Sequence, residues 1–331
     1  MEGNRTRSAP DWPLMGHHAL GYVFSLAVLA SCADSSAPRP ALLSSVAPRG
    51  ATLRGPVGND GGKVSRLLFA CVGDTRPAVE DDTASYPVEV VARIYGDIEA
   101  LSPRPSFVVS TGDYLFASGR RGDIAAAQLD LYMRARALYS GAFFPAMGNH
   151  ECTGATVSNC ALTPTATYSI FLQSVLGSID RAVPYYAVRI DAIDASWSAK
   201  VVFVAANAWS SAQQTWLEGA LSVSTTYTFV VRHEPASETE APGVAPSETL
   251  MARHPYTLAI VGHTHTYGHY RDHPREVLIG NGGAPLSSKT FGFGVFAQAP
   301  DGTIVVDMVD WQSGERDPAF HFVVAPDGTW L

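Results

Sequence analysis

The feature of this sequence that most constrains its fold is a succession of short apolar segments, each followed at once by small or polar residues. These segments are residues 66–72, 107–110, 143–147, 201–205, 228–231 and 258–261. Apolar runs of this length, without alternating polar positions, are typical of strands covered on both faces. Residues 87–100, 123–138 and 213–221 lie between them and carry apolar residues at helical spacing. Strands that alternate with helices in this way predict an α/β fold.

The last part of the chain has a different pattern. Its apolar segments are residues 276–279, 294–297, 303–309 and 320–324, and they are separated by Gly, Pro and Asp-Gly turns. This spacing predicts an antiparallel meander. We therefore expect one folded domain, with strands and helices first and mostly strands last.

Polar residues with metal-binding side chains follow the predicted strands. They are Asp74, Asp113, Asn149, His150, Glu151, His233, His263 and His265. Each alone is weak evidence of function, because an Asp after a strand is usually a turn former. Together they mark the carboxyl ends of strands, where open α/β sheets bind ligands. Oxygen and imidazole donors without cysteine suit Mn, Fe or Zn ions and do not suit a structural thiolate zinc site.

The charge of the chain limits its partners. With 23 Lys and Arg against 31 Asp and Glu, the formal net charge is -8. Nucleic acid is not expected as a partner, because phosphate backbones select basic surfaces. An anionic small molecule is still compatible, since bound cations would reverse the local potential.

The N-terminus predicts an export signal. Residues 15–30 are mainly apolar and follow Arg5 and Arg7, which is the pattern of a secretory signal. The segment closes with Leu-Ala-Ser before Cys32, which resembles the lipobox of bacterial lipoproteins, so Cys32 is the expected lipid acceptor. The alternative is a plain signal peptide or anchor with an incidental cysteine. Both alternatives predict an exported protein, and the first predicts a lipid anchor at the membrane surface, in the periplasm or on the cell surface.

The domain boundaries follow from composition. Residues 1–31 are assigned to the signal peptide. Residues 32–62 are rich in Ser, Ala, Pro and Gly and are assigned to a flexible tether, because they cannot bury enough surface to fold. Residues 63–331 form the expected folded domain.

The other cysteines have different expected roles. Cys71 lies in an apolar segment and is expected in the core. Cys152 and Cys160 lie eight residues apart in a loop rich in Gly, Thr, Ser and Asn. Outside the cytosol such a pair predicts a disulfide. A metal site is the alternative, but it would need tighter spacing and further ligands.

Taken in order, the strand-end motifs resemble those of a known superfamily. Gly-Asp at 73–74, Gly-Asp at 112–113, Gly-Asn-His-Glu at 148–151 and Gly-His-Thr-His at 262–265 are similar to the motifs of calcineurin-like metallophosphoesterases. That superfamily includes purple acid phosphatases, protein phosphatases and phosphodiesterases. The resemblance runs from about Leu67 to Val309. It implies a four-layer α/β/β/α sandwich with two mixed β-sheets, and two metal ions of the Mn, Fe or Zn class.

The resemblance also implies a role for each residue. Asp113 would bridge the two ions. Asp74 and His265 would bind the first ion, whereas Asn149, His233 and His263 would bind the second. His150 would be the acid next to the scissile ester. Glu151 would orient this loop, or it would be an ordinary solvated carboxylate.

Two positions depart from the family pattern. Many members have Asp-x-His at the first motif, but this chain has Arg76 at the third position, and a guanidinium cannot bind a cation. Purple acid phosphatases have a tyrosine ligand three residues after the second-motif Asp, where this chain has Phe116. Arg76 either faces the site as a fixed positive charge for a phosphoryl oxygen, and is then catalytic, or lies on the surface or in an ion pair. In the second case the first metal site is weak or absent.

The resemblance implies hydrolysis of a phosphomonoester or phosphodiester by a hydroxide that bridges the metal ions. The alternative is a degenerate fold that acts as a non-catalytic binding or scaffold protein, because two ligands of the first ion are missing. Hydrolysis of a non-phosphate ester is a third and more remote alternative. The natural substrate and the oligomeric state do not follow from the sequence.

Overall fold

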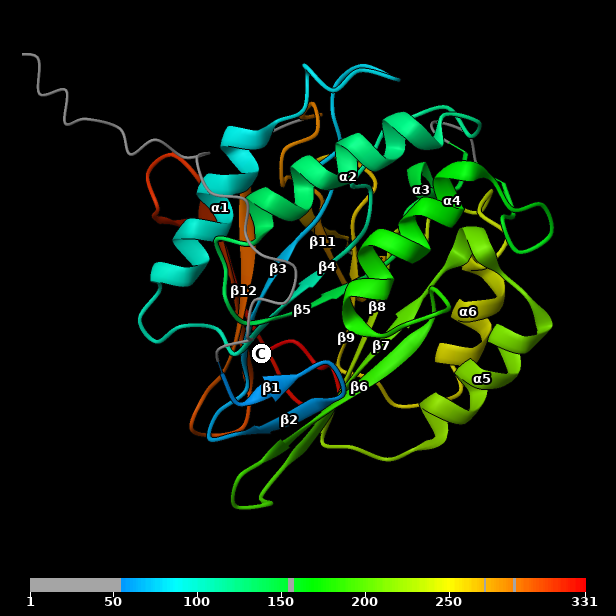
Figure 1. Ribbon diagram of the computed structural model, residues 1–331. Helices are drawn as coiled ribbons and strands as arrows, with labels where there is room; N and C mark the ends of the chain where they lie inside the picture. Colours follow the sequence, from blue (N-terminus) through cyan, green and yellow to red (C-terminus); the bar gives the residue numbers. More distant parts are fainter. Residues whose placement is uncertain (1–54, 154–157, 271, 288–289) are drawn as a thin grey trace, which may run out of the picture. The chain divides into compact units, whose positions relative to one another are not determined.

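Two mixed β-sheets lie face to face at the centre of the structure, a computed structural model that describes residues 55–153, 158–270, 272–287 and 290–331 (Figure 1). All of these residues fall within the unit Val46–Leu331. The predicted signal peptide, the lipid acceptor Cys32 and most of the predicted tether lie outside the described residues.

The larger sheet has eight strands, in the order β1-β2-β6-β7-β8-β9-β11-β10. Strands β7, β8, β9 and β11 run parallel to one another, and this parallel block is buried. In the order of the sheet the strands are β1 (Val57–Gly58), β2 (Gly61–Val64), β6 (Tyr186–Ala192), β7 (Ser198–Val204), β8 (Tyr227–Arg232), β9 (Leu258–Val261), β11 (His273–Ile279) and β10 (Tyr267–Tyr270).

The second sheet has six strands, in the order β14-β13-β12-β3-β4-β5. Strands β3, β4 and β5 are parallel, whereas β12, β13 and β14 form an antiparallel meander that joins the sheet through β12 and β3. In sheet order they are β14 (Arg316–Val324), β13 (Ile304–Asp310), β12 (Gly292–Gln298), β3 (Leu68–Val72), β4 (Phe107–Ser110) and β5 (Ala142–Pro145).

Helices cover the outer face of each sheet (Figure 1). Helices α1 (Val88–Ala100) and α2 (Gly122–Arg136) place Tyr95 and Tyr132 against Phe143 of the six-stranded sheet. Helices α5 (Ser211–Ser222) and α6 (Val244–Met251) bury apolar residues against β7, β8 and β9. The four-layer sandwich predicted from the sequence is therefore confirmed.

Shorter helical segments connect these layers. They are α3 (His150–Thr153), α4 (Ala166–Phe171), the π-helical turn Leu172–Leu176 and the 3₁₀ turns Gly177–Ile179 and Ala206–Ala208. Within the described ranges, none of the helices combines the length and the apolar composition that a membrane span requires.

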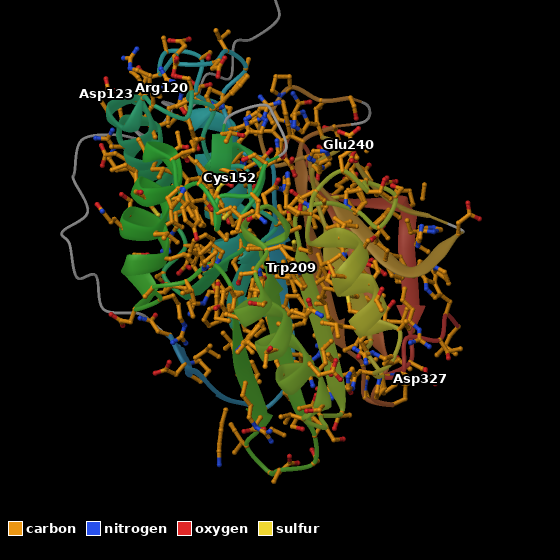
Figure 2. The ribbon with its side chains drawn as sticks, turned by 90° about the vertical axis from the view of Figure 1, so that its right-hand side faces the viewer. Arg120, Asp123, Cys152, Trp209, Glu240 and Asp327 are labelled. Carbon is orange, nitrogen blue, oxygen red and sulfur yellow. A yellow bond between two sulfur atoms is a disulfide. The ribbon has the colours of Figure 1, made fainter. Side chains whose placement is uncertain are left out.

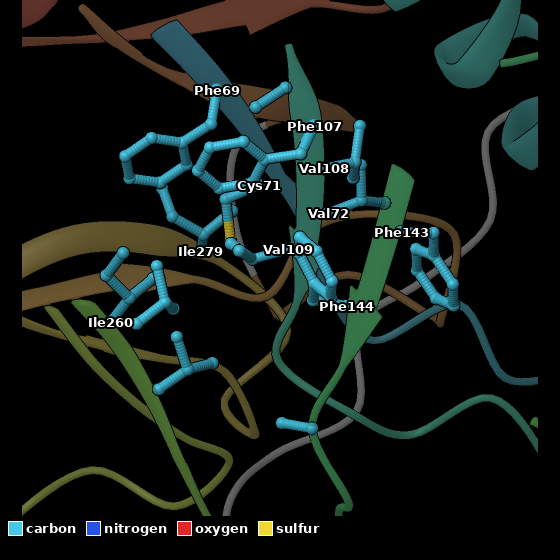
Figure 3. Close-up of a cluster of buried hydrophobic side chains, with 14 of the residues drawn as sticks. Phe69, Cys71, Val72, Phe107, Val108, Val109, Phe143, Phe144, Ile260 and Ile279 are labelled. Atoms are coloured by element: carbon cyan, nitrogen blue, oxygen red, sulfur yellow. The ribbon is translucent and has the colours of Figure 1, made fainter. Parts of the chain in front are cut away.

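The core between the sheets is built from aromatic rings. Phe69 stacks on Phe107 at 5.0 Å and on Phe296 at 4.7 Å, between ring centroids. Its ring also meets the edge of Phe229 from the eight-stranded sheet, at 5.1 Å. Figure 3 shows Phe69 and Phe107 side by side, with Cys71 in the same cluster. Cys71 is a buried free thiol, as its apolar surroundings predicted.

The predicted secondary structure is mostly confirmed, with one error of assignment. The predicted helices correspond to α1, α2 and α5, and the last three apolar segments form the meander β12–β14. The segment 276–279 does not belong to that meander. It is part of β11, which pairs in parallel with β9 in the other sheet. An apolar run specifies a strand but does not specify the strand's partner.

The folded part also begins earlier than the predicted boundary at residue 63. Strand β1 and the first residues of β2 lie in the segment assigned to the tether, and β2 pairs in parallel with β6. A Cβ atom at Gly61 would lie 1.9 Å from the carbonyl oxygen of Arg189. Glycine allows this close approach. The glycine content that suggested a flexible tether therefore allows β2 to pair with β6.

Candidate metal centre

The carboxyl ends of strands from both sheets bring the predicted ligands together. Strands β3, β4 and β5 lead to Asp74, Asp113 and the loop that carries Asn149 and His150, whereas β8 and β9 lead to His233 and His263. Because parallel strands end at the same edge of a sheet, the local sequence pattern becomes a spatial cluster.

Asp113 lies at the centre of this cluster. Its side chain is 1% exposed, and Oδ2 lies 3.3 Å from His233 Nε2 and 3.7 Å from His150 Nε2. Oδ1 accepts a hydrogen bond of 3.1 Å from the backbone N–H of His150. Burial raises the pKa of Asp113, but its electrostatic interactions with His233, His150 and Arg76 and its hydrogen bond from His233 outweigh burial and hold this pKa well below its usual range.

The predicted ligands of the second ion converge on one another. Asn149 Oδ1 lies 3.1 Å from His233 Nε2 and 3.1 Å from His263 Nδ1, and these two nitrogens are 3.2 Å apart. His233 Nδ1 lies 2.9 Å from the carbonyl oxygen of Thr111, which can only accept. The Nδ1–H of His233 therefore donates to the backbone carbonyl. Nε2 faces the cluster, where its lone pair can bind a cation.

The predicted ligands of the first ion also lie close together. Asp74 is buried, and both of its carboxylate oxygens lie 3.0 Å from the backbone N–H of His263. His265 Nε2 is 3.6 Å from Asp74 Oδ1, while its Nδ1 is bonded to the carbonyl oxygen of Pro285 at 2.8 Å. His265 thus directs Nε2 toward the carboxylate.

The structure supports a cation at this place. Ligand atoms of Asp74, Asp113 and His233, all buried, lie within 4.8 Å of one another, and within the described residues this is the group of three such side chains that could hold an ion. Burial raises the pKa of Asp74 well above its usual range, and the nearby Asp113 raises it further although His233 opposes this. Two neighbouring buried carboxylates are costly unless a cation lies with them, so these residues fit a divalent metal ion.

Backbone conformation holds these side chains in place. Asp74, Asp113, His263 and His265 have φ values of 57°, 58°, 74° and 52°, and they are four of the seven described non-glycine residues with positive φ. This conformation is unfavourable for residues with a side chain and concentrates at functional sites. The sharp turns after the strands point the side chains back into the cluster.

Glu151 is a structural residue of the centre and not a solvated carboxylate. It is fully buried, and its two oxygens accept hydrogen bonds from the N–H groups of Asp113 at 2.9 Å, Tyr114 at 2.7 Å and Gly148 at 2.7 Å. Burial and the nearby Asp113 raise the pKa of Glu151 to about 7. The carboxylate joins the loops that follow β4 and β5, as the orienting alternative predicted.

Arg76 faces the cluster and does not lie on the surface. Its Nε is 3.8 Å from Asp113 Oδ2, and only 13% of the side chain is exposed. The guanidinium lies over the ring of Phe116 at 4.7 Å, and NH1 donates to the carbonyl oxygen of Pro77 at 3.0 Å. Arg76 therefore places a fixed positive charge at the site and also forms an ion pair with Asp113, so features of both sequence-based alternatives are present, and its catalytic role stays a prediction.

His150 also lies against Phe116. The edge of one ring meets the face of the other, with centroids 4.6 Å apart. Burial lowers the pKa of His150 to about 3 although Asp113 opposes this, so the imidazole is neutral near pH 7 in the metal-free chain. His150 Nδ1 is buried without a hydrogen-bond partner among the described atoms.

The predicted disulfide joins the centre to its surroundings. Cys152 and Cys160 are bonded, with Cα atoms 5.6 Å apart. The N–H of Cys160 donates to the carbonyl oxygen of Asn207 at 2.8 Å, and the Asn207 amide donates to Glu234, the neighbour of His233. Figure 2 shows Cys152 in the interior, away from Arg120 and Asp123 at the margin. The disulfide closes the loop that follows β5, and these hydrogen bonds connect that loop to the residues that follow β7 and β8.

Asn207 and Glu234 were missed by the sequence analysis. Both are buried polar residues, and Asn207 follows the apolar segment 201–205 as the predicted ligands follow theirs. The same strand-end signal could have identified them.

The comparisons with known proteins agree with this geometry. The profile of the family described as calcineurin-like phosphoesterase matches residues 67–267. No curated protein matches the sequence. The structure resembles a purple acid phosphatase, PPD1 from yellow lupin (Lupinus luteus), with 14% identity, a TM-score of 0.59, and coverage of 82% of this chain and 55% of the lupin chain. This chain thus spans about half the length of the lupin protein.

Two further solved structures have a similar fold. GAP50 of Plasmodium, described as the anchor in the inner membrane complex, has 18% identity and a TM-score of 0.57, covering 80% of this chain and 90% of that protein. A dimetal phosphatase from Danio rerio has 16% identity and a TM-score of 0.52, covering 78% and 99%. At these identities the likeness shows the fold alone. Because the family profile covers more than half of its residues, this chain belongs to the calcineurin-like phosphoesterase family.

Proposed function

We propose that this protein hydrolyses a phosphate ester, either a monoester or a diester, with the help of divalent metal. The observation that carries the proposal is the buried triad of Asp74, Asp113 and His233, whose ligand atoms lie within 4.8 Å of one another. A bound Mn, Fe or Zn ion would polarise a phosphoryl oxygen and lower the pKa of a water molecule. Metal identity and the preference for monoester or diester are left to experiment.

The residues of the chain would have distinct tasks. Asp74, Asp113 and His233 would hold a metal ion, with the predicted ligands Asn149, His263 and His265 beside them. Arg76 would bind a phosphoryl oxygen through its fixed charge, since a guanidinium stays protonated and suits the geometry of phosphate. An anionic phosphate near His150 would raise its pKa, which would allow the imidazole to protonate the departing alkoxide.

A non-catalytic role is the second candidate. Arg76 and Phe116 occupy positions where the family pattern has metal ligands, and one structural neighbour is described as an anchor. Against this role, the ligands Asn149, His233 and His263 converge beside Asp113, and a binding protein has no need of that arrangement.

We further propose that the protein is exported and anchored by lipid on Cys32. The apolar segment 15–30 supports this, and so does the disulfide between Cys152 and Cys160, because disulfides persist in oxidising compartments.

The test is turnover of aryl phosphate monoesters and diesters by the full chain with added Mn²⁺, compared with chelator. Asp113→Asn should lower kcat by at least about 100-fold, the order of effect that follows loss of a metal or charge-stabilising group. Asp307→Asn is the matched control, because Asp307 is a buried and ion-paired carboxylate on β13, outside the cluster. Equal turnover in wild type and Asp113→Asn contradicts the site. Absence of turnover with every divalent metal favours the non-catalytic role.

A further inference from the structure

The position of Arg76 raises the question of how many metal ions the centre holds. Its guanidinium is fixed from two sides, by the Phe116 ring at 4.7 Å and by the Pro77 carbonyl at 3.0 Å. Its Nε is buried, has no hydrogen-bond partner among the described atoms, and lies 3.8 Å from Asp113 Oδ2. A permanent positive charge is therefore held next to the carboxylate that two ions would have to share.

The ligand atoms favour a single ion. The described triad takes Asp74 from one predicted site and His233 from the other, together with the shared Asp113. In the part of the chain that the structure describes, Asp74, Asp113 and His265 do not bring ligand atoms within the same 4.8 Å. Nor can the third position of the first motif provide a ligand, because Arg76 is a donor without a free electron pair.

Charge also argues against a second ion. A guanidinium does not lose its proton, so a second dication near Asp113 would have to lie close to a fixed like charge in a buried site, where repulsion is poorly screened. One dication and the guanidinium together more than neutralise Asp74 and Asp113. The remaining positive charge is enough to attract an anionic phosphoryl group.

We propose that this protein binds one divalent cation per chain, at Asp74, Asp113 and His233, and that the Arg76 guanidinium takes the place of a second cation. The number of ions does not depend on the proposed function. The role of Arg76 as a phosphoryl-binding group does rest on it.

The test is the stoichiometry of Mn²⁺ binding, measured by equilibrium dialysis of the metal-stripped full chain and by elemental analysis. Wild type should bind one Mn²⁺ per chain. Arg76→His should bind two, because it replaces a fixed positive charge by a neutral nitrogen donor. Arg136→His is the matched control: Arg136 also lies over a phenylalanine ring, Phe143 at 4.9 Å, but on helix α2 and outside the cluster. It should bind one Mn²⁺.

Each outcome has a defined meaning. Two ions per wild-type chain, or none, would overturn the proposal, and this measurement needs no variant. If wild type binds one ion and Arg76→His, shown to be folded by circular dichroism, also binds one, Arg76 does not set the limit and its assignment is wrong. Should Arg76→His fail to fold, the electron paramagnetic resonance spectrum of Mn²⁺-loaded wild type decides: isolated ions support the proposal, and spin-coupled pairs overturn it.

The two proposals fail separately. One bound ion without turnover of any phosphate ester contradicts the proposed function and leaves the stoichiometry intact. Turnover with two bound ions per wild-type chain supports the function and overturns the role given to Arg76.

Discussion

Burial controls the charge of the residues in the centre. His150 is buried and His263 is partly buried beside carboxylates, and in both the effect of burial exceeds that of the nearby negative charge, with His233 lowering the pKa of His263 further. Their pKa values fall to about 3 and about 4, from an ordinary 6.5. Both rings are consequently neutral in the folded, metal-free chain near pH 7, which is the form in which histidine binds metal.

This gives a pH dependence of stability. Because the folded pKa values of these two histidines lie below the unfolded value, the unfolded chain binds more protons at them between pH 6.5 and about 4. They therefore make the metal-free protein less stable as the pH falls through that range, whereas the raised pKa of Glu151 acts in the opposite direction. The contribution of His150 has an upper limit of about 5 kcal/mol. Thermal unfolding of wild type and of His150→Gln between pH 8 and pH 4.5 would measure the contribution of His150. His150→Gln should flatten the profile, and an unchanged slope in that variant would contradict the assignment.

The sequence predicted which residues form the site better than it predicted what those residues contact. The ligand residues were found because they follow strands, which is a local property of the chain. The stacking of Arg76 on Phe116, and the three backbone hydrogen bonds to Glu151, join residues from different loops. Such contacts depend on the tertiary fold, so the sequence left alternatives open for both residues.

The loops that follow β4 and β5 are packed backbone to backbone. Gly112 has a φ of 109°, and a Cβ atom there would lie 2.6 Å from the backbone nitrogen of Gly148. Side chains of any size are therefore excluded between the loops that carry Asp113 and His150.

Gly112→Ala should destabilise the protein by at least about 2 kcal/mol, through both the clash and the unfavourable backbone conformation. Gly96→Ala is the control, because Gly96 lies in helix α1 with no atom within 4 Å of the added Cβ. That substitution should stabilise by about 0.5–1 kcal/mol, since alanine favours helices. Urea unfolding compares the two. A Gly112→Ala protein as stable as wild type would show that these loops are not in contact.

Elements were predictable where the pattern was local and long. Helices α1, α2 and α5 have apolar residues at helical spacing, and the buried parallel strands are continuous apolar runs. Strands β1 and β2 were missed because each has a single apolar residue, Val57 or Val64, in a glycine-rich sequence. Strand β11 was given to the wrong sheet because its pairing with β9 is not a local property of the sequence.

A bound metal ion would couple the two sheets of the folded unit. The ligands come from both sheets, so a bound cation joins strand ends that would separate on unfolding. Mn²⁺ at 100 times its Kd should stabilise the protein by about 2.7 kcal/mol, which raises Tm by several degrees for a domain of this size. Differential scanning fluorimetry with Mn²⁺ and with chelator would detect the shift. It should disappear in Asp113→Asn and persist in Asp307→Asn; a shift of equal size in both would place the ion elsewhere.

The pairing of β3 with β12 has a consequence for the synthesis of this protein. Residues 68–71 are hydrogen-bonded to residues 294–297, and β12 in turn carries β13 and β14. On a ribosome, β3 can therefore pair with β12 only after residues 294–297, more than 200 positions later, have been translated. Until then one edge of the β3-β4-β5 block has no partner and is open to aggregation. The six-stranded sheet is completed only after residues 316–324 of β14 have been translated.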